Sequence, residues 1–268
     1  ITISAGDLTG TASFTPTDDS TYEGNETGIV AIDSVTGADA AESATPQVVT
    51  VTITEDDSTP TVTLTSSAAS IDEDAGSSLT LTATLSNPTT ADVTVALSTS
   101  GTGIEGTDYA TISDITISAG DLSATTSFTP TDDSIYEGDE TGIVAIDSVS
   151  GGSATESGTQ AVTITINEDE TAPVVNLSVG SNSITENSGS SITVTATMNF
   201  ATIIDTDITI STSGTALEGT DYGSVADITI SAGDTTGTAT FTPTDDTVYE
   251  GNETATITMA SITGADAG

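Results

Sequence analysis

An internal repeat of ~113 residues constrains the fold of this chain more than any other feature. The heptapeptide ITISAGD begins at Ile1, Ile115 and Ile228, and the octapeptide GIVAIDSV occurs at residues 28–35 and again at residues 142–149. A unit of this length suits one independent domain and is too long for one repeat of a solenoid. The sequence therefore predicts a row of similar domains.

The repeat divides the chain into three expected domains. Residues 59–170 contain one complete repeat, residues 1–58 begin late in theirs, and residues 171–268 stop before their last strand. We therefore expect the C-terminal part of one domain, one complete domain and one domain without its last strand. This organisation is typical of a window cut from a longer array.

Apolar residues that alternate with Thr and Ser mark the strands of the complete repeat. Seven segments show the alternation: 62–71, 79–85, 93–97, 112–117, 125–128, 142–146 and 162–166. No segment has helical periodicity. Seven short antiparallel strands in roughly 110 residues indicate a β-sandwich, so we expect an all-β fold.

The charge of the chain excludes whole classes of partner. Of 268 residues, 41 are acidic and none is Lys, Arg or His, which gives a formal net charge of −41. Nucleic-acid binding needs Lys and Arg at the phosphates, and an anionic membrane surface repels such a chain. No apolar run approaches the ~18 residues of a membrane span. We expect neither a nucleic-acid partner nor membrane insertion in this segment.

Catalysis has few chemical groups to work with. Without His, Cys or Lys the chain has no catalytic triad, thiolate or Schiff base. A pair of carboxylates could cleave glycosides, but the acids of this chain crowd at a domain tip that lacks aromatic neighbours. We expect no enzyme and no catalytic residue.

The acids of the complete repeat are predicted to gather at one end of the sandwich. If successive strands run up and down, the first, third and fifth loops and the exit segment share that end. These segments hold thirteen of the eighteen acids of residues 59–170. The fifth loop alone reads TDDSIYEGDE from Thr131, with close copies from Thr17 and Thr244.

Such crowding favours bound cations. Two like charges ~4 Å apart near a protein surface repel by roughly 4 kcal/mol, so the loops either splay apart or hold cations. Oxygen ligands without His or Cys favour Ca²⁺ over Zn²⁺ or copper, and flexible loops favour it over Mg²⁺. The alternative is plain solvation of an acidic surface.

Four motifs resemble the Calx-beta domain, which occurs in sodium–calcium exchangers and in large bacterial surface proteins. They are SIDEDAGSS at Ser70, EGTDYA at Glu105, TPTDDSIYEGDET at Thr129 and VTITINEDE at Val162. The resemblance covers the whole chain. It implies tandem seven-stranded immunoglobulin-like β-sandwiches of the Calx-beta type, in an adhesin-like array, with Ca²⁺ in the loops at one end.

The resemblance also implies the calcium ligands. In the complete repeat they are Glu73, Asp108, Asp132, Asp133, Glu137, Glu168, Asp169 and Glu170. In the first repeat they are Asp18, Asp19, Glu23, Glu55, Asp56 and Asp57, and in the third Glu186, Asp221, Asp245, Asp246 and Glu250. Asp139 and Glu140 match less well, Asp139 least because Asn25 and Asn252 replace it. The family's terminal run is typically three Asp, whereas this chain has Glu-Asp-Glu or Glu-Asp-Asp. Asn187 in place of Asp74 is expected to weaken the third site.

The leading functional hypothesis is mechanical. Seven residues join the predicted strands at Ile166 and Val174, and three of them are expected ligands. A short linker that coordinates ions is no free hinge, so we expect an extracellular, cell-surface stalk or filament that Ca²⁺ stiffens at its junctions. The expected partners are neighbouring repeats and copies of the chain in a fibre. The alternatives are an adhesive module and a calcium sensor.

Overall fold

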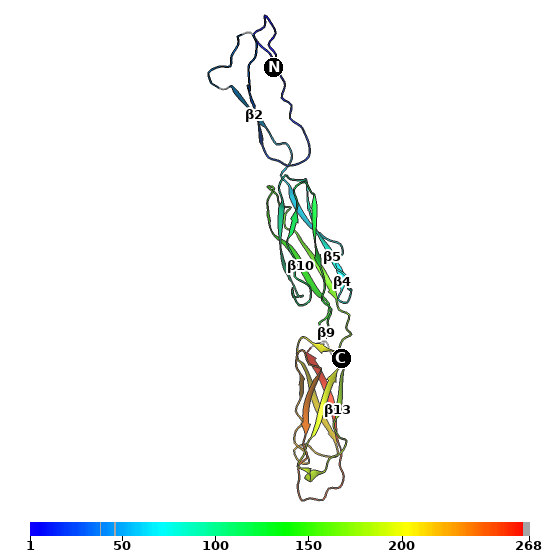
Figure 1. The fold of residues 1–268 in the computed structure, drawn as a ribbon. Helices are drawn as coiled ribbons and strands as arrows, with labels where there is room; N and C mark the ends of the chain where they lie inside the picture. Colours follow the sequence, from blue (N-terminus) through cyan, green and yellow to red (C-terminus); the bar gives the residue numbers. More distant parts are fainter. Residues whose placement is uncertain (38, 46, 265–268) are drawn as a thin grey trace.

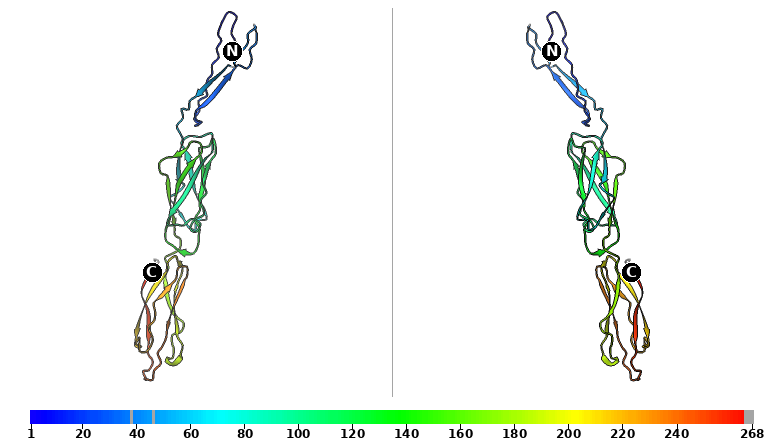
Figure 2. Two further views of the ribbon diagram at one scale, coloured as in Figure 1. Left: turned by 90° about the vertical axis from the view of Figure 1, so that its left-hand side faces the viewer. Right: turned by 90° about the vertical axis from the view of Figure 1, so that its right-hand side faces the viewer.

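The computed structural model describes residues 1–37, 39–45 and 47–264. Three β-rich parts follow one another along one long axis, with the N-terminal part at one end (Figure 1). The two views at right angles to the first show the same elongated arrangement (Figure 2). The described residues therefore form an elongated arrangement of three parts.

The middle part is a sandwich of two sheets. One sheet has the order β4-β12-β10-β6-β7, formed by Ser70–Asp72, Ala161–Asn167, Glu140–Ser150, Val93–Gly101 and Ile115–Ile117. The facing sheet has the order β11-β3-β5-β8, formed by Thr155–Glu156, Thr61–Ser66, Leu79–Leu85 and Ser123–Phe128. The main pairings are antiparallel, whereas β4 pairs with β12, and β11 with β3, in parallel.

The core lies between these two sheets. In β5 the buried residues are Leu81, Ala83 and Leu85, and the Thr residues between them point outward. This alternation is what a strand with one buried face requires. The Phe128 ring is fully buried and stacks on Tyr109 with 4.7 Å between ring centroids. Phe128 and Tyr109 are therefore core residues, whereas Tyr136 is only partly buried.

The predicted strands are present, several of them longer than predicted, and the main differences in the two sheets lie in three places. The segment 62–71, predicted as one strand, is two, because the chain leaves β3 after Ser66 and joins the other sheet as β4. Ser66 Oγ donates to the Ala68 carbonyl oxygen (2.7 Å) within this crossing. The strand expected over 112–117 starts only at Ile115, and the two-residue β11 carries no alternation that could have predicted it.

The third part repeats this plan with fewer strands. Its sheets are β13-β14-β18, formed by Val175–Val179, Ile192–Met198 and Thr236–Phe241, and β17-β16-β19, formed by Ile228–Ile230, Thr206–Gly214 and Ala255–Gly264. A single 3-10 turn, η1 (Glu186–Ser188), lies in its first loop. Its core includes Val194, Ile208 and Ile230, each fully buried.

In the first part, the described residues form one antiparallel pair, β1 (Glu26–Ala31) and β2 (Val48–Ile53). Its apolar side chains have no facing sheet among the described residues, so Ile29 and Val49 are 68% and 63% exposed. No helix in the described residues is long and apolar enough to cross a membrane.

Short backbone pairings connect successive parts. β9 (Ile135–Tyr136), from the TDDSIYEGDE loop, pairs in parallel with β15 (Ala201–Thr202) of the third part. At the preceding junction, Tyr22 forms the same kind of bridge with Thr89, and its backbone N–H donates to the Pro88 carbonyl oxygen (3.0 Å). Neighbouring parts therefore contact each other at two places: the linker and this pairing.

Candidate metal centre

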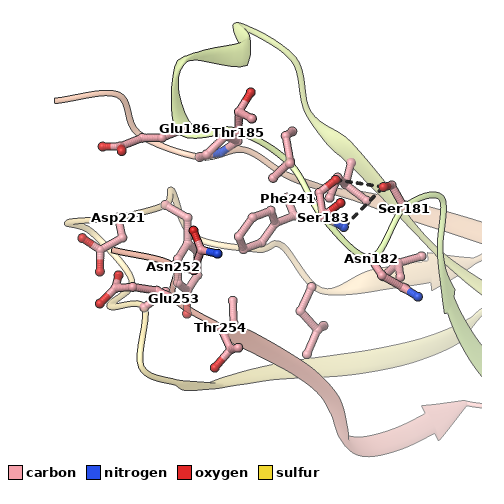
Figure 3. A pocket seen from close by; sticks show the side chains of 18 of the residues that line it. Ser181, Asn182, Ser183, Thr185, Glu186, Asp221, Phe241, Asn252, Glu253 and Thr254 are labelled. Atoms are coloured by element: carbon pink, nitrogen blue, oxygen red, sulfur yellow. Dashed lines mark hydrogen bonds between the residues drawn. The ribbon is translucent and has the colours of Figure 1, made fainter. Parts of the chain in front are cut away.

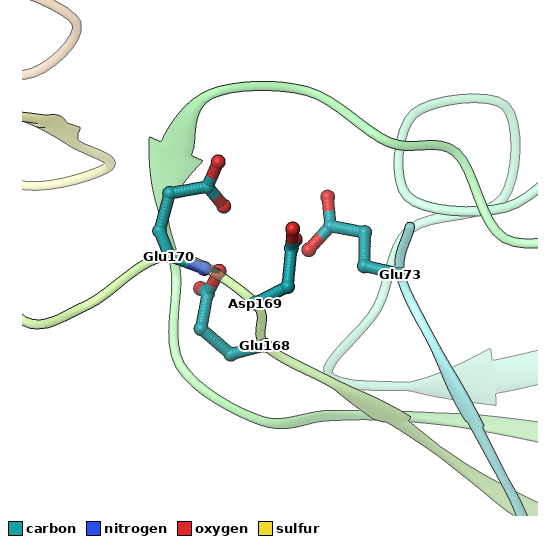
Figure 4. A group of neighbouring side chains, drawn as sticks. All are labelled: Glu73, Glu168, Asp169 and Glu170. Atoms are coloured by element: carbon teal, nitrogen blue, oxygen red, sulfur yellow. Dashed lines mark hydrogen bonds between the residues drawn. The ribbon is translucent and has the colours of Figure 1, made fainter. Parts of the chain in front are cut away.

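The topology brings the acidic segments of the middle sandwich together at its exit end. Glu73 directly follows β4, and Glu168 to Glu170 directly follow β12. Because β4 and β12 are parallel neighbours, their carboxyl ends lie at the same edge of the sheet. Glu73, Glu168, Asp169 and Glu170 each offer a carboxylate oxygen, and all four oxygens lie within 4.8 Å of one another. Figure 4 shows the side chains of these residues gathered beside the linker.

A second group lies at the same end. Asp108, Glu137 and Glu140 also bring carboxylate oxygens within 4.8 Å of one another. Asp108 is from the third loop, Glu137 from the fifth, and Glu140 is the first residue of β10. In the resemblance to the Calx-beta domain, Glu140 matched the ligand positions less well than the expected ligands did. A signal was available, since Glu stands at this position in all three repeats as Glu26, Glu140 and Glu253, whereas position 139 varies.

Burial makes the negative charge of these groups unfavourable. Glu73 is only 7% exposed and Asp108 only 8%. Burial, followed by the charges of Glu168 and Asp133, raises the pKa of Glu73 to about 7. Burial and the charge of Asp108 also raise the pKa values of Glu137 and Glu140 to about 7. Since the chain has no Lys, Arg or His, no side chain can offset these charges.

Glu170, in the group with Glu73, Glu168 and Asp169, has a carboxylate oxygen without a hydrogen-bond partner in the described part of the chain. Burial and its contact with Glu168 raise the pKa of Glu170 to about 7. Its Oε2 atom is buried and has no hydrogen-bond partner among the described residues. An unsatisfied buried oxygen is destabilising unless a donor or a cation reaches it.

Glu168 has a different position in the group. Its Oε2 accepts the backbone N–H groups of Glu137 (2.6 Å) and Gly138 (2.7 Å), and its Oε1 accepts that of Glu170 (3.0 Å). Burial raises the pKa of Glu168, but these hydrogen bonds outweigh it, so the pKa lies below the ordinary value. Glu168 therefore remains ionised and fastens the fifth loop to the exit segment.

The first part has the same arrangement. Glu55 Oε2 accepts the N–H groups of Glu23 and Gly24, both at 2.6 Å, and Oε1 accepts that of Asp57 (2.9 Å). Glu55, Asp56 and Asp57 offer oxygens within 4.8 Å of one another. A small hollow of about 40 Å³ beside them is also lined by Asp18, Asp19 and Glu23. All six acids expected in this repeat thus surround one space.

The second Asp of each TDD motif shapes its loop. Asp133 Oδ1 accepts the backbone N–H of Ile135 (2.7 Å), two residues further along. Asp19 and Asp246 accept the N–H groups of Thr21 (2.7 Å) and Val248 (2.6 Å) in the same way. These are Asx turns, which fix a loop without any ion.

The third part carries two further groups of acids. Glu186, Asp246 and Glu250 form one, and Asp221, Glu250 and Glu253 form the other. All of these acids except Asp246 line an open hollow of about 910 Å³, which Phe241 also lines. Figure 3 shows Glu186 on one side of the opening and Asp221 and Glu253 on the other. In the middle sandwich the equivalent space lies between β4 and β10, and β12 fills it.

Several expected ligands lie outside the close groups. They are Asp18, Asp19, Glu23, Asp132, Asp133 and Asp245, whereas Glu140 and Glu253 lie inside a group without having been expected. Asp132 is near enough that its charge helps to raise the pKa of Asp169, after burial and Asp74. Asp245 is exposed and lies at the surface of its loop.

The donor set fits a hard divalent cation. Every side chain in these groups offers carboxylate oxygen, which Ca²⁺ prefers. All of the groups except Glu55 to Asp57 combine residues from separate loops, and the buried Glu170 Oε2 has no hydrogen-bond partner among the described residues. Chemically, such a site neutralises charge and ties loops together; the groups contain no base or nucleophile other than carboxylate.

One known family of domains matches this chain along nearly its whole length. The sequence profile described as "Calx-beta domain" matches residues 5–57, 55–170 and 168–267. No curated protein matches the chain in sequence.

Several solved structures share a likeness in fold. CBD12 from CALX1.2 is 16% identical over 68% of this chain and 74% of its own, with a TM-score of 0.36. The calcium-binding domain CBD12 of CALX1.1 is 16% identical over 70% and 76%, with a TM-score of 0.34. Invasin, a bacterial integrin-binding protein, is 17% identical over 79% of this chain and 39% of its own, with a TM-score of 0.30.

The profile matches cover well over half of the chain, in three successive copies. The chain therefore belongs to the Calx-beta domain family.

Proposed function

We propose that this chain is a segment of an extracellular, cell-surface stalk or filament of an adhesin-like protein, stiffened by Ca²⁺ at its domain junctions. The domains would be residues 1–58, 59–170 and 171–268. The observation that carries the proposal is the position of the acids, because Glu73 meets Glu168 to Glu170 in the linker that leads to the next domain.

Two features of the junction support a mechanical role. The exit segment both carries the acids and is fastened by Glu168 to the fifth loop. The same loop pairs with the next domain through Ile135 and Tyr136. An ion held by Glu73, Asp169 and Glu170 would tie the first loop to the linker. Because Glu168 of the linker holds the fifth loop, and the fifth loop pairs with the next domain, the neighbouring domain would be held as well.

Calcium would also remove a repulsion that the chain cannot offset. Carboxylates this close repel by roughly 3–4 kcal/mol per pair at an effective dielectric near 20, which is large beside a domain stability of about 5–15 kcal/mol. Extracellular calcium, near millimolar, suffices even for weak sites. On losing the ion, the loops are expected to separate and the linker to bend.

Small-angle X-ray scattering of the full chain, with calcium and with a chelator, tests the proposal. We expect a longer maximum dimension and a narrower distribution of shapes with calcium. Glu73→Gln should reduce the change in dimensions on adding calcium, because it removes one negative charge from the group formed by Glu73 and Glu168 to Glu170. Asp147→Asn, at an exposed acid on β10, is the matched control and should respond like the unchanged chain.

Dimensions that are the same with calcium and with chelator would refute the stiffening role. If calcium binds without such a change, the calcium-sensor alternative gains support. Binding of a separate surface ligand by a chain whose shape ignores calcium would favour the adhesive alternative.

A further inference from the structure

The two most repeated motifs of this sequence meet across each domain junction. The TDD-x-x-Y-E-G loop lies at the exit end of one domain and pairs with a loop at the entry end of the next domain. In that next domain, the Ser-Ala-Gly-Asp turn holds the paired loop. We call residues 21–22, 135–136 and 248–249 the docking edges. Residues 88–89 and 201–202 are the receiving loops.

The receiving loop is built the same way in both domains that contain it. The Thr89 carbonyl oxygen accepts the Gly120 N–H (2.8 Å), and the Thr202 carbonyl oxygen accepts the Gly233 N–H (2.9 Å). Both Thr side chains are buried, at 2% and 0% exposure.

The turn that holds each receiving loop is itself fixed. Asp92 Oδ1 accepts the Ala119 N–H, and Asp205 Oδ1 accepts the Ala232 N–H, both at 2.9 Å. Backbone hydrogen bonds thus hold the receiving loop in the same way at the entry end of both domains, and they use the Ala and Gly of the repeated ITISAGD motif.

The docking edge is preformed in all three repeats by the Asx turns described above. Two of the three edges are occupied: Tyr22 bridges to Thr89, and Ile135 and Tyr136 pair with Ala201 and Thr202. The tyrosines of these two edges are partly buried. In the third edge Val248 is 62% exposed and Tyr249 is 97% exposed.

We propose that Val248 and Tyr249 form a docking site for the receiving loop of another Calx-beta domain. The same edge receives that loop twice within this chain by parallel backbone pairing, as an isolated bridge at Tyr22 and as a two-residue strand pair at Ile135 and Tyr136. Because the exit end of one domain fits the entry end of the next, the contact is head-to-tail and extends without closing. The pairing itself uses backbone groups and no carboxylate, although Asp246, whose Asx turn shapes the third edge, also belongs to an acidic group.

Two extended chains test the proposal. The first adds residues 156–170 after Gly268, which completes the third domain by the repeat alignment but supplies no receiving loop. The second adds residues 156–268, which supplies the same completion and a further domain with its receiving loop. Hydrogen exchange at the Tyr249 amide is compared in the two, with the Tyr136 amide of each chain as internal reference.

We expect the Tyr249 amide to exchange at least about tenfold more slowly in the longer chain, approaching Tyr136, and to remain fast in the shorter one. Tyr249→Pro in the longer chain removes the N–H, and exposure of the added domain's receiving loop should then increase. Equal exchange of Tyr249 in the two chains, with Tyr136 protected in both, would overturn the proposal.

Repeating the comparison with chelator separates docking from calcium stiffening. A difference between the two chains that persists with chelator supports docking even if scattering shows no response to calcium. A scattering response to calcium without any protection of Tyr249 would leave the stalk proposal standing and refute this one.

Discussion

The side chain at position 139 acts as a hydrogen-bond acceptor for the exit segment. Asp139 Oδ1 accepts the backbone N–H of Glu168 (3.1 Å), and Asn25 Oδ1 accepts that of Glu55 (2.9 Å). Only an acceptor oxygen is used, and both Asp and Asn provide one. The variation that marked position 139 as a weak ligand therefore reflects a hydrogen bond that needs no charge.

This role predicts different outcomes for two substitutions. Asp139→Asn should leave the thermal stability and calcium affinity nearly unchanged. Asp139→Ala should destabilise the exit segment by about 1 kcal/mol, because the Glu168 N–H loses its partner. Thermal unfolding and calcium titration of both variants check this. A loss of calcium affinity in Asp139→Asn as large as in Asp139→Ala would show that the charge itself matters.

At the scale of elements, strand direction explains most of the site. Alternating strands were enough to predict that the first, third and fifth loops share an end with the exit segment, and Glu73 does meet Glu168, Asp169 and Glu170 there. The sequence could not predict which carboxylates would be used as hydrogen-bond acceptors. That choice depends on where backbone N–H groups point, as at Glu168, and no residue pattern encodes it.

The raised pKa values predict how these loops respond to pH. Four glutamates, Glu73, Glu137, Glu140 and Glu170, have pKa values near 7 in the folded chain against 4.5 ordinarily. Between these values the folded state holds protons that the unfolded state has released, so it is stabilised by acid. The stabilisation is complete below the ordinary value and is lost as the pH rises through about 7.

Without calcium, the melting temperature of the chain should therefore fall from about pH 5 to about pH 8. With calcium the fall should be smaller or reversed, because the ion needs the ionised carboxylates that high pH supplies. Calorimetry in the presence of chelator and of calcium measures both. A chelated chain that becomes more stable as the pH rises would contradict this prediction.

At the scale of the whole molecule, the net charge of −41 causes repulsion both between distant charges and between close ones. Charges farther apart than the Debye length, ~10 Å at 0.1 M salt, are screened by ordinary salt. The grouped carboxylate oxygens lie within 4.8 Å of one another, inside that length. Simple screening is therefore ineffective where the domains join.

Calcium and sodium should consequently differ in effect. Calcium at about 2 mM should raise the melting temperature by about 4–8 °C for each kcal/mol of binding. Sodium chloride at matched ionic strength should produce a much smaller change. Differential scanning calorimetry of the full chain in both salts checks this. Equal shifts would indicate general screening and would favour a merely solvated acidic surface.

The sequence by itself determined the repeat, the alternation that makes strands, and the absence of any side-chain cation. Tertiary structure alone decided which carboxylates are used as hydrogen-bond acceptors. Glu168 and Glu170 stand two residues apart in one acidic run, yet Glu168 accepts three backbone N–H groups. Oε2 of Glu170 is buried without a hydrogen-bond partner among the described residues. The physical reason is that two of the N–H groups that reach Glu168 belong to Glu137 and Gly138 of the fifth loop, which only the folded chain brings beside the exit segment.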